Sequence, residues 1–199
     1  KYSDSPANLA NLRERMVDSR SFGEIRGLLD RCSRGWWLEK LEIEVDAEAL
    51  CAEAMRLYHA GQLNDAMTAF EQARAGFAAQ GNAAQAASVA NDLGVVCVRA
   101  GRLPQASRAL SDALAAFEKL GDVSGQAKAI GNLAQVMDRT GDKDNAEKNF
   151  TRAAELFHQV GERGLERDTY RALSRMQLQR GRWLEALAAY DRALAAKGG

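Results

Sequence analysis

The sequence predicts an all-α fold, a right-handed superhelical solenoid of antiparallel helix pairs. A glycine returns every 40 residues, and an alanine stands five residues after each of these glycines. Large apolar residues and further alanines keep the same 40-residue spacing. A fixed period of this length is typical of solenoids, in which each repeat buries its apolar face against its neighbours. The columns are Gly61, Gly101, Gly141 and Gly181; Ala66, Ala106, Ala146 and Ala186; Phe70, Leu110, Phe150 and Tyr190; and Ala73, Ala113, Ala153 and Ala193.

Each repeat is predicted to contain two helices joined by a tight turn. In residues 87–97 the apolar and small side chains follow three- and four-residue steps, Gly101 interrupts them, and residues 103–117 resume them. Pro104 marks the start of the second helix, because proline is tolerated in the first turn, where its missing N–H has no partner inside the helix. A second glycine column predicts left-handed caps that end the second helices. These glycines are Gly81, Gly121 and Gly161.

We expect one continuous domain over residues 1–199, because a repeat packs only on its neighbours and chain length then measures the number of repeats. Small residues in the first helices, such as Gly94 and Ala134, allow the paired backbones to approach closely. Trp183 stands in a column that holds leucine in the first two repeats, so we expect it in the core. The four predicted repeats span residues 48–87, 88–127, 128–167 and 168–199.

Residues 6–47 predict a degenerate N-terminal repeat and a junction. Shifting this stretch by 81 residues brings its apolar residues into the columns of a full repeat, and terminal repeats are often atypical because one face meets solvent. Trp36 and Trp37 are adjacent, and neighbouring side chains on a helix diverge by about 100°. Both therefore cannot enter the same core. Either they pack at an irregular junction or one of them contributes to a docking surface.

The repeat unit resembles the tetratricopeptide repeat, TPR. The features that carry the resemblance are the glycine or alanine late in the first helix, the turn glycine, the alanine five residues later and the apolar residue four positions beyond it. The TPR consensus has 34 residues. Six additional residues per repeat, about three in each helix, lengthen each helix by roughly 4 to 5 Å at about 1.5 Å per residue. The segment from Leu120 to Asp142 is similar to the 40-residue variant found in the LGN family of spindle-orientation adaptors and in the sensor arrays of bacterial STAND-type and Rap-type regulators. HEAT-type repeats have a similar period, but the alanine and apolar residue after the turn favour TPR.

Composition bounds the partners and the location of the protein. The sequence holds 27 basic and 27 acidic residues, a net charge of zero, so the long-range attraction that drives non-specific nucleic-acid binding is absent. We therefore predict no nucleic-acid partner. No run of 18 apolar residues and no charged-then-apolar leader occurs, which predicts no membrane span and no secretion signal. Three widely spaced cysteines without a CxxC pair indicate reduced thiols, so we expect a cytoplasmic protein.

No enzyme motif occurs in the sequence. It contains no GxxxxGK phosphate loop, no GxGxxG after a strand, no HExxH and no nucleophile elbow. His59 and His158 fall in different repeats and lack cysteine or carboxylate neighbours at metal-ligand spacing. A role for them at the surface or in helix capping is expected. We predict no catalysis, no cofactor and no metal site.

The TPR resemblance implies a partner site in a concave groove, which the first helix of each repeat lines in that family. An extended ligand would place about three residues on each repeat, since packed helices lie about 8 to 10 Å apart and an extended chain advances about 3.3 Å per residue. Arginines there can bind carboxylates with paired N–H donors; alternatively they are solubilising surface residues with Asp138 and Asp168 as counter-charges. The predicted partner-binding residues are Met55, Tyr58, His59, Asn91, Val95, Val98, Arg99, Asn132, Gln135, Asp138, Arg139, Arg171 and Arg175.

The resemblance also implies a ladder of asparagines that grips a peptide backbone in LGN-like arrays. Asn132 matches the asparagine of the family's GNLG motif. Asp92 stands in that column one repeat earlier, and Ala52 and Ala172 stand in the others. The ladder is therefore incomplete in this chain.

Three functions remain open at this point. The first is a non-catalytic scaffold that binds a peptide or helix of a partner protein in the groove. The second is a ligand-sensing module of a larger signalling or transcription regulator. The third is an assembly factor or structural module that self-associates, for example as a homodimer, through the ends of the array, because the last helix carries apolar residues without an obvious polar cap. These residues are Leu187, Tyr190 and Leu194.

Overall fold

The computed structural model describes residues 46–196 of the chain. The predicted N-terminal repeat, together with Cys32, Trp36 and Trp37, lies outside these residues. Within them the fold is all-α, with eight helices and no strand. None of these eight is both long and apolar enough to cross a membrane.

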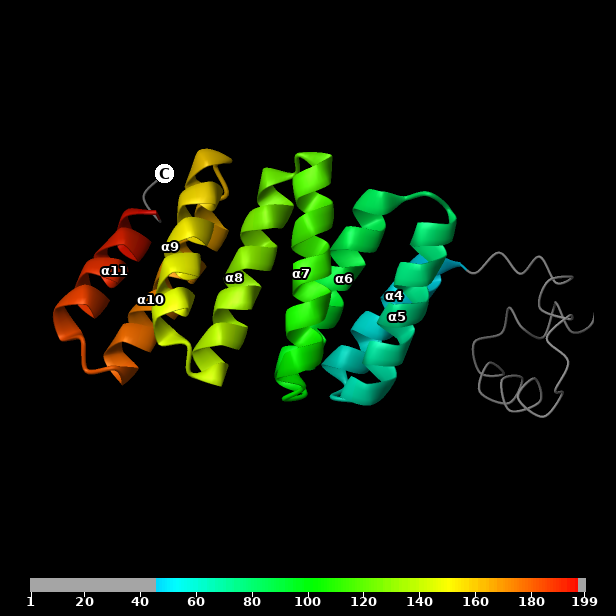
Figure 1. Ribbon diagram of the computed structural model, residues 1–199, viewed down its shortest axis with the longest axis horizontal. Helices are drawn as coiled ribbons and strands as arrows, with labels where there is room; N and C mark the ends of the chain where they lie inside the picture. The colour runs from blue at the N-terminus through cyan, green and yellow to red at the C-terminus, as the bar shows by residue number, and fades with distance from the viewer. Residues whose placement is uncertain (1–45, 197–199) are drawn as a thin grey trace, which may run out of the picture. The chain divides into compact units, whose positions relative to one another are not determined.

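The helices form four hairpins, which Figure 1 shows side by side in chain order. Their bounds are α4 (Ala47–His59), α5 (Leu63–Ala79), α6 (Ala83–Arg99), α7 (Leu103–Leu120), α8 (Val123–Thr140), α9 (Lys143–Gln159), α10 (Arg163–Gln179) and α11 (Trp183–Ala195). Each helix packs against the helices before and after it, and α6 also contacts α8. The first helices of the hairpins are α4, α6, α8 and α10, and the second helices are α5, α7, α9 and α11. This arrangement is the solenoid of helix pairs that the repeat predicts.

A glycine with left-handed backbone closes every turn between these helices, with φ between 69° and 92°. Gly101 is representative: its N–H donates to the Val98 carbonyl at 3.2 Å. The next N–H, of Arg102, donates to the Cys97 carbonyl at 2.9 Å, which completes a Schellman motif. Because a side chain would strain this conformation, the glycine column is fixed by geometry. The glycines are Gly61, Gly81, Gly101, Gly121, Gly141, Gly161 and Gly181. The predicted caps of the second helices are therefore confirmed.

Alanine and large apolar residues fill the core between neighbouring helices. Both alanine columns are buried in the described hairpins. Gly94 of α6 shows why small residues are needed, because a Cβ built on it would collide with the fully buried Leu110 of α7. Cys97 is buried in the same core and Cys51 is half-buried, and both are free thiols.

Trp183 is not a core residue, so the prediction made from its column is wrong. Its exposed fraction is 70%, whereas Leu63 and Leu103 in the same column are half-buried. The difference has a simple cause, because α6 packs beside α5 and α8 packs beside α7. No described helix follows α11. A column therefore predicts burial only where another hairpin covers it.

Candidate partner-binding surface

The predicted partner-binding residues all lie on first helices, and we call them together the first-helix face. They differ in how much surface they offer to a partner. The exposed ones are Met55, His59, Arg99, Gln135, Arg139, Arg171 and Arg175. The half-buried ones are Tyr58, Val95, Asn132 and Asp138. Asn91 and Val98 are buried, which leaves little of either side chain for a direct contact.

A row of amide side chains crosses from α6 to α8 on this face. Asn132 Nδ2 donates to Asn91 Oδ1 at 2.9 Å, and Gln135 Nε2 donates to Asn132 Oδ1 at 3.3 Å. Asn91 Nδ2 lies 3.5 Å from Asp92 Oδ1, at the other end of the row. Each amide has two donor hydrogens and an acceptor oxygen with two lone pairs, so these bonds leave capacity for a partner. We call Asp92, Asn91, Asn132 and Gln135 the amide row.

Asp92 carries the charge of the amide row. Burial raises the pKa of its carboxyl above the ordinary value of 3.8, while the hydrogen bond from Asn91 and the charge of Lys128 act in the opposite direction. Burial, and then the charge of Asp92, raise the pKa of the Cys51 thiol on α4. The Asp92 carboxyl on α6 therefore interacts electrostatically with Cys51 on α4 and with Lys128 on α8, so three successive first helices are coupled at this point.

Arg99 and Arg139 tie successive repeats together. Arg139 Nη1 donates to the Val98 carbonyl at 2.9 Å. Arg99 Nη1 donates to the Tyr58 carbonyl at 3.3 Å, and its guanidinium lies 4.7 Å from the centroid of the Tyr58 ring. Both carbonyls belong to the last turn of a first helix, where a cation is favourable. This structural role was not predicted from the sequence, and contact of either arginine with a partner stays a prediction.

The arginines of α10 have a different environment. Arg171 Nη1 lies 3.6 Å from Asp168 Oδ1, which also accepts a hydrogen bond from Arg167 Nε at 2.9 Å. Arg175 is exposed one turn further along the helix. Asp168 is thus a counter-charge for Arg171, whereas Asp138 pairs with Lys143 at 2.5 Å. The exposed guanidinium groups of Arg171 and Arg175 retain N–H donors that can bind a carboxylate.

A charged cluster around the buried Glu166, at the start of α10, was not predicted. Glu166 is only 6% exposed. Its Oε2 lies 3.1 Å from Arg163 Nη1, and its Oε1 lies 3.0 Å from His158 Nδ1 on α9. The cluster lines a cavity of about 490 Å³ formed by α9, α10 and α11. Helical spacing cannot reveal the contact between His158 and Glu166, because the two residues come from different helices.

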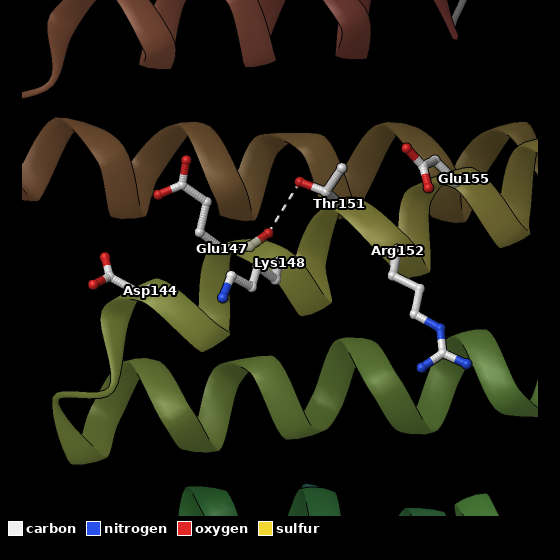
Figure 2. Close-up of a pocket in the computed structure, with 6 residues that line it drawn as sticks. All are labelled: Asp144, Glu147, Lys148, Thr151, Arg152 and Glu155. Atoms are coloured by element: carbon white, nitrogen blue, oxygen red, sulfur yellow. Dashed lines mark hydrogen bonds between the residues drawn. The ribbon is translucent and has the colours of Figure 1, made fainter.

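A second cavity, of about 620 Å³, runs along one face of α9 (Figure 2). All of its lining residues belong to α9. Ligand pockets normally have polar groups that converge from more than one element, and this cavity does not. Its lining residues are Asp144, Glu147, Lys148, Thr151, Arg152 and Glu155. Arg180 binds two of these carboxylates, with Nη2 2.7 Å from Asp144 Oδ1 and Nη1 3.1 Å from Glu147 Oε2. The hydrogen bond from Arg180 and its charge lower the pKa of Asp144. We therefore interpret these residues as a clamp between the last two hairpins.

Neither cavity is lined by a residue of the first-helix face. Among residues 46–196, no group of three or more histidine, cysteine, aspartate or glutamate side chains is placed to hold a metal ion. The amide row and the exposed arginines are thus polar groups that the first-helix face presents outside both cavities. Together, fold and surface define a helical-repeat protein with side-chain bonds between successive first helices.

Comparison with known proteins identifies the repeat. A family model described as tetratricopeptide repeat matches residues 125–197. The chain is also similar to a solved structure described as a putative kinesin light chain with nearly identical TPR-like repeats from Podosopora anserina, at 16% identity and a TM-score of 0.61, covering 98% of this chain and 97% of that one. Residues 125–197 thus match the tetratricopeptide repeat, and the described hairpins have the fold of tetratricopeptide-repeat solenoids.

Two other solved structures share the fold. BtubC from P. vanneervenii is 21% identical, with a TM-score of 0.68, and the match covers 95% of this chain and 77% of that one. A Rap protein, crystallised in complex with Competence and Sporulation Factor, is 23% identical, with a TM-score of 0.71 over 80% of this chain. The present chain spans 45% of that Rap protein's length. A search of curated protein sequences finds no match. At these identities the structural matches show the fold alone.

Proposed function

We propose that this protein is a non-catalytic scaffold that binds a peptide segment or helix of a partner protein on the first-helix face. The observation that carries the proposal is the amide row, in which a bond to Asn91 of the preceding repeat holds Asn132, and Asn132 in turn holds Gln135 within α8. Donors and acceptors that are ordered before binding lose little conformational entropy when a partner arrives. A tetratricopeptide fold with protein partners fits this role.

The charges and apolar groups of the face specify the partner's chemistry. Arg171 and Arg175 suit carboxylates at the α10 end, because guanidinium groups bind carboxylates with paired donors. Met55 and Tyr58 at the α4 end offer apolar and aromatic surface. We therefore propose a partner segment that is acidic toward α10 and apolar toward α4, bound without a cofactor or nucleic acid. The free thiols of Cys51 and Cys97 favour a reducing compartment, and we place this activity in the cytoplasm.

Charge reversal on α10 tests the proposal. A displayed random peptide library is selected on the full chain, and the dissociation constants of enriched peptides are then measured for the variant Arg171→Glu with Arg175→Glu. The matched control is Lys148→Glu with Arg152→Glu on α9, which reverses two exposed charges at the same four-residue spacing (Figure 2). We expect at least a roughly 30-fold weaker complex for the α10 variant, the equivalent of about 2 kcal/mol, and no change for the α9 variant.

Three results would contradict this function. The first is a library that yields no enriched peptide. The second is an enriched peptide set that binds the α10 variant as tightly as the unaltered chain. The third is an equal loss in the α9 control, which would mean that general charge rather than the first-helix face governs binding. Far-UV circular dichroism of both variants checks that helicity is retained, as expected for exposed ion pairs of small energetic value.

A second candidate is a ligand-sensing module of a larger regulator. It is favoured by the similarity to the Rap protein that was crystallised with Competence and Sporulation Factor, a structure of which this chain spans 45%. A sensor must change conformation when its ligand binds. Small-angle scattering with and without a library-selected peptide distinguishes the two, because a rigid scaffold keeps its radius of gyration and a sensor does not.

A further inference from the structure

The last helix presents a row of large apolar side chains to solvent. Trp183, Leu187, Tyr190 and Leu194 are 70%, 58%, 45% and 47% exposed, and Leu184 beside them is 82% exposed. We call these five residues the α11 seam. An adjacent side of the helix is different, because small residues there pack against α10. These are Ala186, Ala189 and Ala193, all of them buried.

The α11 seam continues a surface that is buried elsewhere in the molecule. Tyr190 occupies the column of Phe70, Leu110 and Phe150, which are between 0% and 3% exposed. Each of those residues lies on a second helix against which the next first helix packs. Figure 1 shows α11 at the end of the row of hairpins. No described helix packs on the seam. Its residues are therefore of the type that is buried between hairpins elsewhere, but here they are exposed.

The spacing of the seam suits a second copy of the same helix. Its four central residues follow four-, three- and four-residue steps, the spacing of a coiled-coil contact line. In an antiparallel pair related by a two-fold axis between Leu187 and Tyr190, Trp183 lies opposite Leu194 of the other copy. Leu187 then lies opposite Tyr190 of the other copy. Each contact therefore joins an aromatic ring to a leucine, which matches a large side chain with a smaller one along the whole line.

The exposed area of the seam is sufficient for a dimer. If each exposed fraction is applied to about 200 Å² per large side chain, the seam presents roughly 600 Å² per copy. Two copies would bury about 1,200 Å², the lower limit of specific, stable interfaces. A patch of this size is also at the upper end of what a typical monomer leaves uncovered.

We propose that the α11 seam is a self-association surface, on which two copies of this chain pair through antiparallel α11 helices with two-fold symmetry. The pairing uses α11 alone and leaves the first-helix face free. It therefore does not depend on the scaffold function. A two-fold pair closes at two copies, because each seam is consumed by the other.

Mass measurement with two complementary variants tests the pairing. Analytical ultracentrifugation of the full chain is expected to show a species of twice the chain mass of 21.7 kDa at high concentration. Leu187→Lys and Tyr190→Glu each place an unpaired charge in the interface, so each alone should weaken the dimer at least about 100-fold. When the two variants are mixed in equal amounts, the lysine faces the glutamate across the two-fold axis in the mixed dimer. The mixture is therefore expected to regain dimers that neither variant forms alone.

The control is Leu120→Lys, at the end of α7, since Leu120 is 46% exposed and Tyr190 is 45% exposed. This variant should dimerise like the unaltered chain. A chain that stays monomeric at all concentrations would overturn the proposal. Masses that grow beyond two copies would overturn it in favour of head-to-tail stacking. Failure of the mixed variants to associate would refute the antiparallel register.

Discussion

Replacing Gly94 by alanine measures how closely α6 and α7 pack. A Cβ on Gly94 would collide with Cγ and Cδ2 of Leu110, and Leu110 is fully buried. Alanine is more favourable than glycine inside a helix by about 1 kcal/mol. Overpacking a full core costs about 1 to 3 kcal/mol. Because Leu110 has no free surface, we take about 2 kcal/mol for the collision and expect Gly94→Ala to lose about 1 kcal/mol of unfolding free energy.

Gly131→Ala is the matched control for this substitution. Gly131 also lies inside a first helix, but a Cβ there would meet only the Ala153 Cβ, at an ordinary contact distance of 3.6 Å. The helix propensity then acts alone, so this variant should gain up to about 1 kcal/mol. Urea denaturation followed by circular dichroism at helical wavelengths measures both. The melting temperature should fall by about 2 to 4 °C for Gly94→Ala and rise for Gly131→Ala.

A second-site change in Leu110 refines the test. In the other three hairpins an aromatic residue stands in the column of Leu110, and the residue sixteen positions before it is alanine or serine. In this hairpin the column holds a leucine, and the residue sixteen positions before it is Gly94. A planar ring at position 110 should therefore accommodate the added methyl group, and Leu110→Phe should recover part of the loss in Gly94→Ala. A Gly94→Ala protein as stable as Gly131→Ala would refute the packing argument. An absence of coupling between positions 94 and 110 would refute the pairing.

Two further stability predictions concern charged groups. Glu147 accepts hydrogen bonds from Gln177, Arg180 and Arg182. Glu147→Gln should therefore lose about 1 kcal/mol of unfolding free energy in low salt and less in high salt, as measured from denaturation midpoints. Identical midpoints for the variant and the unaltered chain at low salt would contradict the clamp. Because burial raises the pKa of Asp92, the folded protein holds that proton more tightly than the unfolded chain, and stability falls as pH rises through the folded pKa. Asp92→Asn should therefore raise the midpoint at neutral pH and lose this advantage below the ordinary value of 3.8, and a lower neutral midpoint would contradict it.

The sequence predicted those features that recur by geometric necessity. A turn between packed helices needs positive φ, and so Gly101 and its equivalents are visible as a column. Close approach of α6 to α7 needs a missing side chain, which explains Gly94. Burial of Trp183 was predicted on the same basis and failed, because its column supplies an apolar residue but says nothing about whether another helix covers it.

Contacts between side chains of different helices could not be predicted in this way. Glu166 and His158 meet because α9 ends beside the start of α10, and no spacing along either helix records that distance. The bond from Arg139 to the Val98 carbonyl is similar, since its acceptor is a backbone group that any residue supplies. The repeat columns do record the arginine that makes this bond. Arginine occupies the same position in two successive repeats, as Arg99 and Arg139, and both make the same bond.

That repetition separates structural from functional candidates on the first-helix face. A residue whose bond joins successive repeats is expected to recur at the repeat spacing, as Arg99 and Arg139 do, although Gln179 stands at the equivalent position of the last hairpin. Arg171 and Arg175 have no arginine at the equivalent positions of the other repeats, where cysteine, asparagine and glycine precede Arg171 and methionine, valine and glutamine precede Arg175. Stacking therefore does not require them. Since solvent-exposed arginines outside the repeat pattern add little to stability, we expect their effect on partner binding to exceed their effect on folding. For this reason the partner-binding test uses these two residues and leaves the arginines that tie the repeats unchanged.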